Sequence, residues 1–525
     1  MGKAGGNSSG SETMRMGVHS AGLATFVFFG KFLSLLFGAA MLIILARVLG
    51  PSQYGVYVVA LATAGFISAF GSINIGAYFN KKLPQLIAEK RIAFAGSLIG
   101  DSLIFTIAVS CVLTAAGILL SGSVSGLLFG SQAHYFEIAL ASASIFWIIA
   151  YPMLNTTLIG VGTGKELALS TMSSLVLQST ISIVLVLFGF GADGAIFGYL
   201  SGFALAAVLT GYYINRHVPI SISFNGMRRR LREMLSFSMP LTLSGILGTL
   251  TSNFAVMFLG MLLISSAVIG QYGVAQKIGN VIDLASGAIS VVLVPMFATA
   301  IYRSQSLVKI GKLYHASLYY GLLFTAPMVV YASVLSRDII LTVFTQSYTL
   351  AVLYMPLISV GILIGLVGGY ASSILISYGM VRRILRFSLY TTAVQFASIL
   401  ILGWLFRVIG VIFGYFFIGS TVSSFLYMHE LHRTGLRVRT GPILRMLLSN
   451  TVLGIALIPL IFLQIRPLYV LFLGLAEAFI VYPAALAKTH AISSDDLGVL
   501  RKVGSEMPLV GNALLLIIRY AEALL

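Results

Sequence analysis

Charged residues are scarce in this chain. Of its 525 residues, 9% are Asp, Glu, Lys or Arg, whereas 58% are apolar. An ordinary soluble domain carries roughly 25% charged residues. A chain so poor in charge cannot cover itself with a water-compatible surface, which excludes an ordinary soluble fold. Only 15 residues are acidic, which leaves little material for a cluster of catalytic carboxylates.

Cysteine is almost absent, and this excludes a disulfide framework. The one cysteine, Cys111, has no intrachain partner, and its position in an apolar run predicts a buried packing role. The sequence shows no Cys/His metal spacing and no nucleophile–His–acid set. We therefore expect no catalytic residues, no metal and no cofactor. The polar residues 1–20 and the long apolar run that follows them are not typical of a cleavable signal peptide.

Long apolar runs are what the sequence has in abundance. Many reach about 20 residues, the length of a helix that crosses the hydrocarbon core of a bilayer. They are too long and too uniformly apolar for barrel strands, so the sequence predicts an all-α polytopic membrane protein. We expect fourteen spans, near 22–46, 56–78, 94–120, 138–160, 167–189, 193–213, 235–263, 268–299, 316–335, 351–377, 386–406, 408–428, 446–464 and 468–487.

The positive charges are distributed unevenly between the connections. The N-terminus, the even-numbered connections and the C-terminal tail hold 26 of the 32 Lys and Arg residues. The odd-numbered connections hold four, namely Arg47, Arg337, Arg407 and Arg466. Because cytoplasmic loops retain Lys and Arg during insertion, both termini are expected on the cytoplasmic side of the cell membrane. Topology thus explains the net charge of +17 without a nucleic-acid partner.

An internal repeat divides the chain. GAIFGYL at 194–200 recurs as GVIFGYF at 410–416, and QYGV at 53–56 recurs at 271–274. Two further matches at a nearly constant offset predict that spans 1–6 and 7–12 are two copies of one six-helix bundle in the same orientation. Such parallel repeats can rock around a central transport site, although a duplicated scaffold or enzyme is an alternative. The predicted parts are a tail at 1–21, an N-lobe at 22–215, a basic linker at 216–234, a C-lobe at 235–430, two added helices at 431–488, and a tail at 489–525 with an interfacial helix near 508–518.

One segment carries a family resemblance. ARVLGPSQYGVYVVA at 46–60 resembles the signature of the polysaccharide-transporter branch of the multidrug/oligosaccharidyl-lipid/polysaccharide exporter superfamily. FSMPLTLSG at 237–245 and IGQYGVAQKI at 269–278 also fit this branch. The resemblance implies a flippase for oligosaccharides on a polyprenyl (pyro)phosphate, with the bilayer and pathway glycosyltransferases or a polymerase as partners. Family members often carry an acid late in span 7, where this chain has Asn253, and this puts acid-based ion coupling there in doubt.

Charges inside spans are the first candidates for function, since burying one in hydrocarbon costs at least about 2.5 kcal/mol. Lys31 lies about nine residues into span 1 and is a candidate phosphate ligand, with a snorkelling or structural role as the alternative. The outermost candidate is Arg47, either an outer-gate residue or an interface anchor. In span 8, helical periodicity places a polar stripe on one face, which is either a substrate site or a structural seam between helices. Its members are Gln276 and Asn280 as hydrogen-bonding groups, Lys277 as an anion ligand, and Asp283 as an organiser or protonatable switch.

Two other functions remain open at this stage. A cation-coupled multidrug exporter of the same superfamily would favour an acidic or aromatic cavity, whereas the in-span charges here are mainly cationic. A membrane-embedded polysaccharide polymerase or ligase usually needs a large outer loop or an acidic cluster, and the connections here are short. The sequence therefore favours a flippase that moves a lipid-linked oligosaccharide by alternating access.

Overall fold

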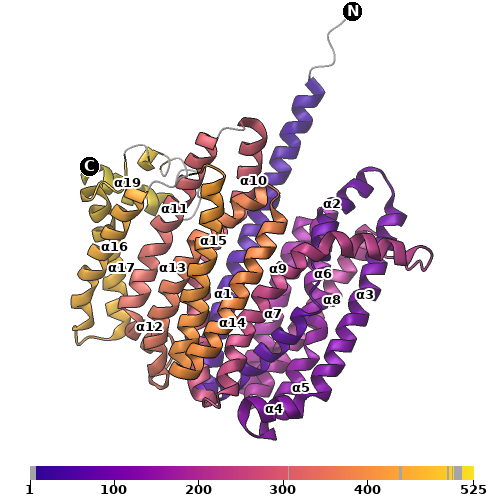
Figure 1. The fold of residues 1–525 in the computed structure, drawn as a ribbon, viewed down its shortest axis with the longest axis horizontal. Coiled ribbons are helices and arrows are strands. Elements are labelled where there is room, and N and C mark those ends of the chain that lie inside the picture. The colour runs from indigo at the N-terminus through magenta and orange to yellow at the C-terminus, as the bar shows by residue number, and fades with distance from the viewer. Residues whose placement is uncertain are drawn as a thin grey trace, which may run out of the picture. The chain divides into compact units, whose positions relative to one another are not determined.

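The computed structural model describes residues 7–304, 307–436, 440–493, 496–498, 501 and 511–524. Within these residues all regular secondary structure is helical, and there is no strand. Figure 1 shows long helices that run side by side within each part of the chain. The all-α fold expected from the sequence is confirmed.

The helices form two compact units, Met1–Gly270 and Gln271–Leu525. Unit 1 contains α1 (Asn7–Ala69), α2 (Ile75–Ala88), α3 (Ile92–Leu119), α4 (Ser121–Phe129), η1 (Gln132–His134), α5 (Tyr135–Ala143), α6 (Ile145–Val161), α7 (Gly164–Leu187), α8 (Gly191–His217), α9 (Met227–Met261) and the start of α10 (Ser266–Ser304). Unit 2 contains the rest of α10, then α11 (Leu307–Val334), α12 (Ser336–Val343), η2 (Gln346–Tyr348), α13 (Thr349–Ser377), α14 (Val381–Ile412), η3 (Phe413–Ile418), α15 (Gly419–Arg433), α16 (Thr440–Ile461), α17 (Pro467–Lys488) and α19 (Gly511–Leu524). In unit 1, α9 packs against α1, α2 and α4. The linker at 216–234, which the sequence repeat places between the N-lobe and the C-lobe, remains a prediction.

Eleven helical segments of the described residues are long and apolar enough to cross a membrane. Two of them contain a backbone break between two expected spans: Phe37–Ala69 breaks at Gly50, and Arg382–Arg433 breaks at Arg407. The expected eighth span lies on α10. Each of the fourteen expected spans therefore falls on a described helix.

The second span ends earlier than the sequence predicts. It begins after the break at Gly50, whose φ of 68° and ψ of 173° are not helical. Pro51 follows, and a residue before proline is pushed out of the α region. The helix then stops at Ala69 rather than near residue 78, and Asn74 accepts a hydrogen bond from the Ala77 amide to cap α2. An asparagine cap is a common way to begin a new helix.

Glycines at equivalent positions of the repeat bring helices together in the same way. In unit 1, a Cβ on Gly198 of α8 would overlap the backbone of Ser182 in α7. In unit 2, a Cβ on Gly414 of η3 would lie 2.9 Å from the backbone carbon of Ser398 in α14. Both residues of each pair are 216 positions from their counterparts, so the two copies share a contact as well as a motif.

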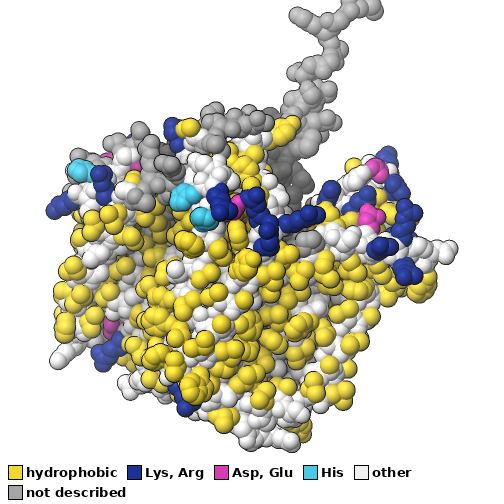
Figure 2. Space-filling model, viewed as in Figure 1, with side chains coloured by type: hydrophobic (Ala, Val, Ile, Leu, Met, Phe, Trp, Pro, Cys, Tyr) yellow, Lys and Arg dark blue, Asp and Glu magenta, His cyan; other side chains and the backbone are white. Residues whose placement is uncertain are grey.

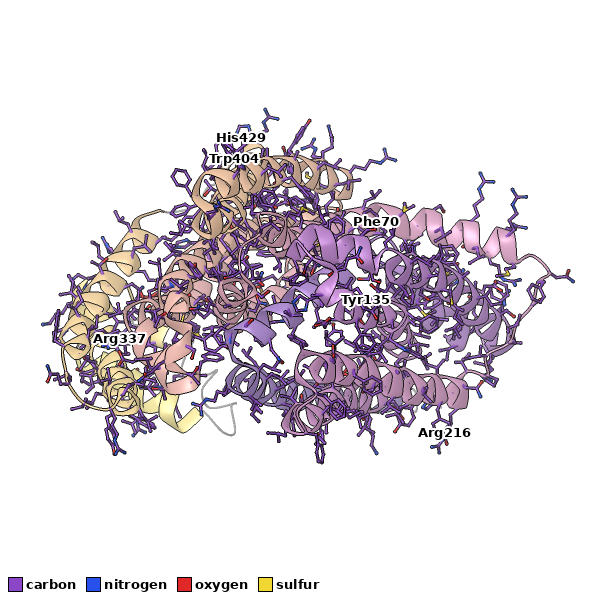
Figure 3. All side chains as sticks on the ribbon, turned by 90° about the horizontal axis from the view of Figure 1, so that it is seen from below. Phe70, Tyr135, Arg216, Arg337, Trp404 and His429 are labelled. Carbon is purple, nitrogen blue, oxygen red and sulfur yellow. The ribbon has the colours of Figure 1, made fainter. Side chains whose placement is uncertain are left out.

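Each unit, taken by itself, has a hydrophobic flank and a basic end. Figure 2 shows Lys and Arg gathered at one end of the helices above a broad apolar flank. Large apolar side chains are exposed there, and Trp404, which is 72% exposed, points outward from α14 (Figure 3). Cys111 is exposed as well, so the predicted buried role is wrong. In a bilayer the outside of the bundle is apolar too, and an apolar run does not by itself tell inside from outside.

Candidate functional site

The predicted polar stripe lies along α10. Lys277, Asn280 and Asp283 are exposed, and Gln276 is half-buried. The other side of the helix is apolar and buried, with Ala275 fully covered and Ile282 4% exposed. Residues three positions apart on a helix lie about 60° from one another around its axis, so these polar groups share one broad side of α10.

Three contacts fix α10 against α13 in unit 2. The side-chain oxygen of Gln271 accepts a hydrogen bond from the Leu350 amide at 2.6 Å. Further along α10, a Cβ on Gly279 would lie 2.7 Å from the Ile358 side chain of α13. Near the end of α13, the Ser377 hydroxyl donates a hydrogen bond to the Val294 carbonyl of α10 at 3.0 Å. The contacts advance along both helices together, so α10 and α13 run parallel. This is the direction expected of two even-numbered spans.

The other predicted site residues, Lys31 and Arg47, belong to unit 1. Lys31 is in α1, but its side chain is outside the part of the chain that the structure describes. Arg47 is exposed, three residues before the break at Gly50. Asp283 lies close enough to Tyr370 of α13 for its charge to act on that buried hydroxyl. Such a position suits an organising role for this carboxylate, which stays a prediction.

The repeated QYG motif performs the same structural task twice. Gln53 accepts a hydrogen bond from the Ala192 amide at 3.2 Å, at the first turn of α8. Its counterpart Gln271 accepts from Leu350 at the first turn of α13. Helix N-termini leave amide groups without partners inside the helix, and each glutamine satisfies one of them. The motif that carries the family resemblance therefore ties two helices together in each copy of the repeat.

The same motif also makes a tight helix crossing within unit 1. A Cβ on Gly55 would overlap the carbonyl oxygen of Ser266, and a Cβ on Gly270 would overlap the carbonyl oxygen of Pro51. Only glycine allows backbones to approach so closely. The crossing joins the helix after Gly50 to the first turn of α10.

A buried ion pair was not predicted from the sequence. Asp101 of α3 is fully buried, and Arg230 of α9 binds it through two hydrogen bonds of 2.5 and 3.1 Å. Arg230 also donates to the carbonyls of Ser223 and Asn225. The hydrogen bonds to Asp101 raise the pKa of the Arg230 guanidinium above its ordinary value. In unit 2, Arg383 forms an ion pair with the buried Glu430.

These two arginines belong to basic clusters that the sequence analysis explains by membrane topology. The acidic partners could have predicted these ion pairs from the sequence, because burying an unpaired acid inside an apolar span costs free energy. Asp101 interrupts the apolar run of span 3 and marks such a site. The pair holds the linker between α8 and α9 onto α3, where Ser221 and Gly96 also share a backbone hydrogen bond of 3.3 Å.

Breaking this pair is expected to destabilise unit 1. Asp101→Asn leaves the guanidinium without its counter-charge, and removing one partner of a buried ion pair costs about 3–5 kcal/mol. The Tm of the purified protein in one detergent should fall clearly for this variant. Arg228→Ala, an exposed change in the same cluster, should leave the Tm unchanged. Equal Tm values for Asp101→Asn and the wild type would show that the pair does not hold the linker.

Comparisons with solved structures identify the fold. The chain is similar to the lipid II flippase MurJ in its inward closed conformation, with a TM-score of 0.66 and 14% identity over 88% of this chain and 98% of that chain. It is also similar to an inward-facing multidrug resistance MATE family transporter of the MOP superfamily, with a TM-score of 0.64 and 18% identity over 77% and 94% of the two chains. A mutant of the MATE transporter VcmN of Vibrio cholerae gives 0.52 and 15% over 79% and 98%. At these identities the likeness concerns the fold alone.

Comparisons of sequence identify the family. No curated protein matches the chain. The family model described as polysaccharide biosynthesis protein matches residues 44–353, which is more than half of the chain. The matched range includes the segment 46–60, the ion pair of Asp101 with Arg230, and the polar stripe of α10. The resemblance read from the sequence is therefore confirmed, and the chain belongs to the family of polysaccharide biosynthesis proteins.

Proposed function

We propose that this protein is a flippase, which moves an oligosaccharide linked to a polyprenyl (pyro)phosphate across the cell membrane by alternating access. The observation that carries the proposal is Lys277, an exposed cation on the polar side of a helix that is otherwise apolar. The family and the likeness in fold to a lipid II flippase support the same function.

The chemistry of the proposed site follows from its residue types. A (pyro)phosphate is a concentrated negative charge, and a lysine ammonium is a compact positive one. Their attraction is strong where water is scarce, so Lys277 and Lys31 together would distinguish a phosphorylated carrier from neutral lipids. Gln276 and Asn280 would add hydrogen bonds to phosphate or sugar oxygens, and Asp283 would orient the neighbouring groups.

A reconstituted assay separates this function from its alternatives. Purified protein in liposomes should move a fluorescent polyprenyl-diphosphate saccharide to the opposite leaflet, where it becomes open to quenching. A cationic dye should not be transported, and the lipid-linked sugar should be recovered with its chain length unchanged. Dye transport would favour the exporter, and a lengthened sugar chain would favour a polymerase.

One described residue weighs against acid-coupled export through span 7. Asn253 stands where family members often carry an acid, and its amide donates to the Thr249 carbonyl at 2.8 Å. Its side chain also lies against Gly65 of α1, where a Cβ would be 2.6 Å from the amide oxygen. The position therefore carries a neutral packing group in this chain.

The proposed orientation places both termini in the cytoplasm. Alkaline phosphatase, which is active only outside the cytoplasm, should be active when fused after Gly130 and inactive when fused after Gly162. These turns lie at the two ends of the helices α5 and α6, so the pair of fusions serves as its own control. The opposite pattern would invert the orientation and place the basic end outside.

A further inference from the structure

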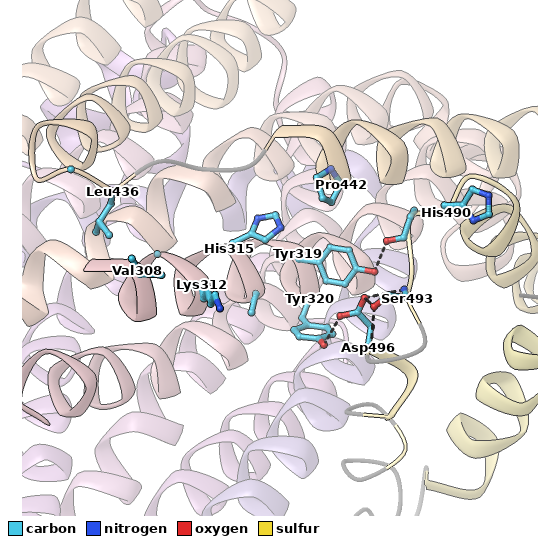
Figure 4. Close-up of a pocket in the computed structure, with 14 residues that line it drawn as sticks. Val308, Lys312, His315, Tyr319, Tyr320, Leu436, Pro442, His490, Ser493 and Asp496 are labelled. Atoms are coloured by element: carbon cyan, nitrogen blue, oxygen red, sulfur yellow. Dashed lines mark hydrogen bonds between the residues drawn. The ribbon is translucent and has the colours of Figure 1, made fainter. Parts of the chain in front are cut away.

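A cavity of about 520 Å³ lies in unit 2, and none of its lining residues comes from α10. Four segments form its walls: the first turns of α11, the turn after α15, the first turn of α16 and the chain that follows α17 (Figure 4). Ligand pockets typically measure about 300–1,000 Å³. The cavity is therefore large enough for a small headgroup.

Hydrogen bonds between α11 and the chain after α17 hold the walls in place. The Tyr319 hydroxyl donates to the Ala491 carbonyl at 2.7 Å, and the Tyr320 hydroxyl donates to one oxygen of Asp496 at 3.1 Å (Figure 4). The other oxygen of Asp496 accepts from the amide and hydroxyl of Ser493, at 3.0 and 2.6 Å. Both carboxylate oxygens are thus engaged within the wall, and the carboxylate is a structural group.

Apart from these wall contacts, the lining contains one ammonium group, two imidazoles and apolar side chains. Lys312 is exposed at the cavity, and the half-buried His315 lies one turn further along α11. The imidazole of His490 points away from Tyr319 in Figure 4. Leu436 and Pro442 add apolar surface. A ligand that fits this lining has a negative charge next to a short apolar portion.

The position of the cavity along the helices indicates the source of such a ligand. Candidate spans begin at Ile310 and Gly441 and end at Arg433 and Lys488. Each wall of the cavity includes residues close to one of these four ends, and the α11 wall continues to Tyr320. This is the level at which hydrocarbon gives way to the polar headgroups of a bilayer.

We propose that this cavity binds the phosphate headgroup of an anionic phospholipid. Lys312 supplies the charge that faces the phosphate, and Leu436 and Pro442 contact the glycerol and the first carbons of the chains. Basic pockets between membrane helices bind anionic headgroups in this way. The site is separate from the α10 stripe in its lining residues, and it does not depend on which substrate the protein transports.

The purified full-length protein in a neutral detergent provides the test. Short-chain phosphatidylglycerol should raise its Tm in a saturable manner, and short-chain phosphatidylcholine should not. Lys312→Gln should raise the half-saturating concentration of phosphatidylglycerol about fivefold, the usual contribution of one basic residue near an anionic lipid surface. Lys312→Arg should retain most of the effect. Lys488→Ala removes a charge from the end of α17 outside the cavity and should change nothing.

Each other result overturns the proposal. An equal shift with phosphatidylcholine would remove charge recognition, and an equal shift with inorganic phosphate would replace the lipid by a free anion. Tighter binding of polyprenyl phosphate, lost in Lys312→Gln, would reassign the cavity to the carrier lipid. An equal loss in Lys488→Ala would show a diffuse charge effect. Should Lys312→Gln fail to fold, the comparison of the four ligands on the wild type still decides between these outcomes.

Discussion

Replacing Lys31 and Lys277 together by alanine is expected to abolish transport of a polyprenyl-diphosphate saccharide. At about 4 Å and an effective dielectric constant near 20, two unit charges attract by about 4 kcal/mol. Losing most of this attraction at one lysine corresponds to at least a hundredfold loss. We therefore expect Lys277→Ala alone to lower the initial transport rate about a hundredfold, and the double variant to fail in a flippase-deficient strain.

The control variants separate charge from folding. Lys277→Arg keeps the positive charge at the same place and should retain a measurable rate, whereas Lys488→Ala should behave as the wild type. Insertion and yield of the double variant should be unchanged, because the apolar length of both spans is kept and Lys277 is exposed. Full transport by the double variant would remove both lysines from the proposed site, although the protein could still be a flippase.

Much of the fold was predictable because membrane insertion leaves a strong signal in the sequence. A bilayer accepts apolar helices of nearly one length, and fourteen such runs fall on described helices. The repeat was equally informative. Gly198 and Gly414 were found as a matched pair in the sequence, and the structure places both against the same partner positions in the preceding helix.

What could not be predicted depends on contacts between segments distant in the chain. The sequence shows four arginines at 228–232, but only the fold shows that Arg230 reaches Asp101, 129 positions earlier. The exposure of Cys111 was missed for a related reason, because apolar surface lies on both sides of a membrane helix. The break at Gly50 lies in the connection expected between the first two spans, but the end of the second span at Ala69 was not predicted.

The candidate site was predicted only in part. Helical periodicity was sufficient to put Gln276, Lys277, Asn280 and Asp283 on one side of a helix, because all four belong to one element. Helical periodicity cannot predict whether they line a substrate path, because that depends on how charges of separate helices come together. The cavity beside Lys312 illustrates the difference. Its lining comes from four segments spread over nearly two hundred residues, so no local sequence pattern predicts it.

The second large effect is expected at the glycine crossing between the QYG motif and α10. Gly55→Ala would place a methyl group on the carbonyl oxygen of Ser266. Backbone atoms cannot move aside as a flexible side chain can, so the two helices must separate. In an alternating-access cycle, helices from the two copies of the repeat have to approach and part at each end of the transport path. We expect this variant to lose at least nine-tenths of its transport rate while it still inserts.

Gly270→Ala tests the same crossing from its other side, because its methyl group would meet the carbonyl oxygen of Pro51. If both glycines serve one contact, the first substitution already opens it, and the double variant should be no worse than either single one. Independent defects would multiply instead. Gly211→Ala adds a methyl group in open space on α8 and should transport normally. A wild-type rate for Gly55→Ala would mean that this crossing does not take part in the transport cycle.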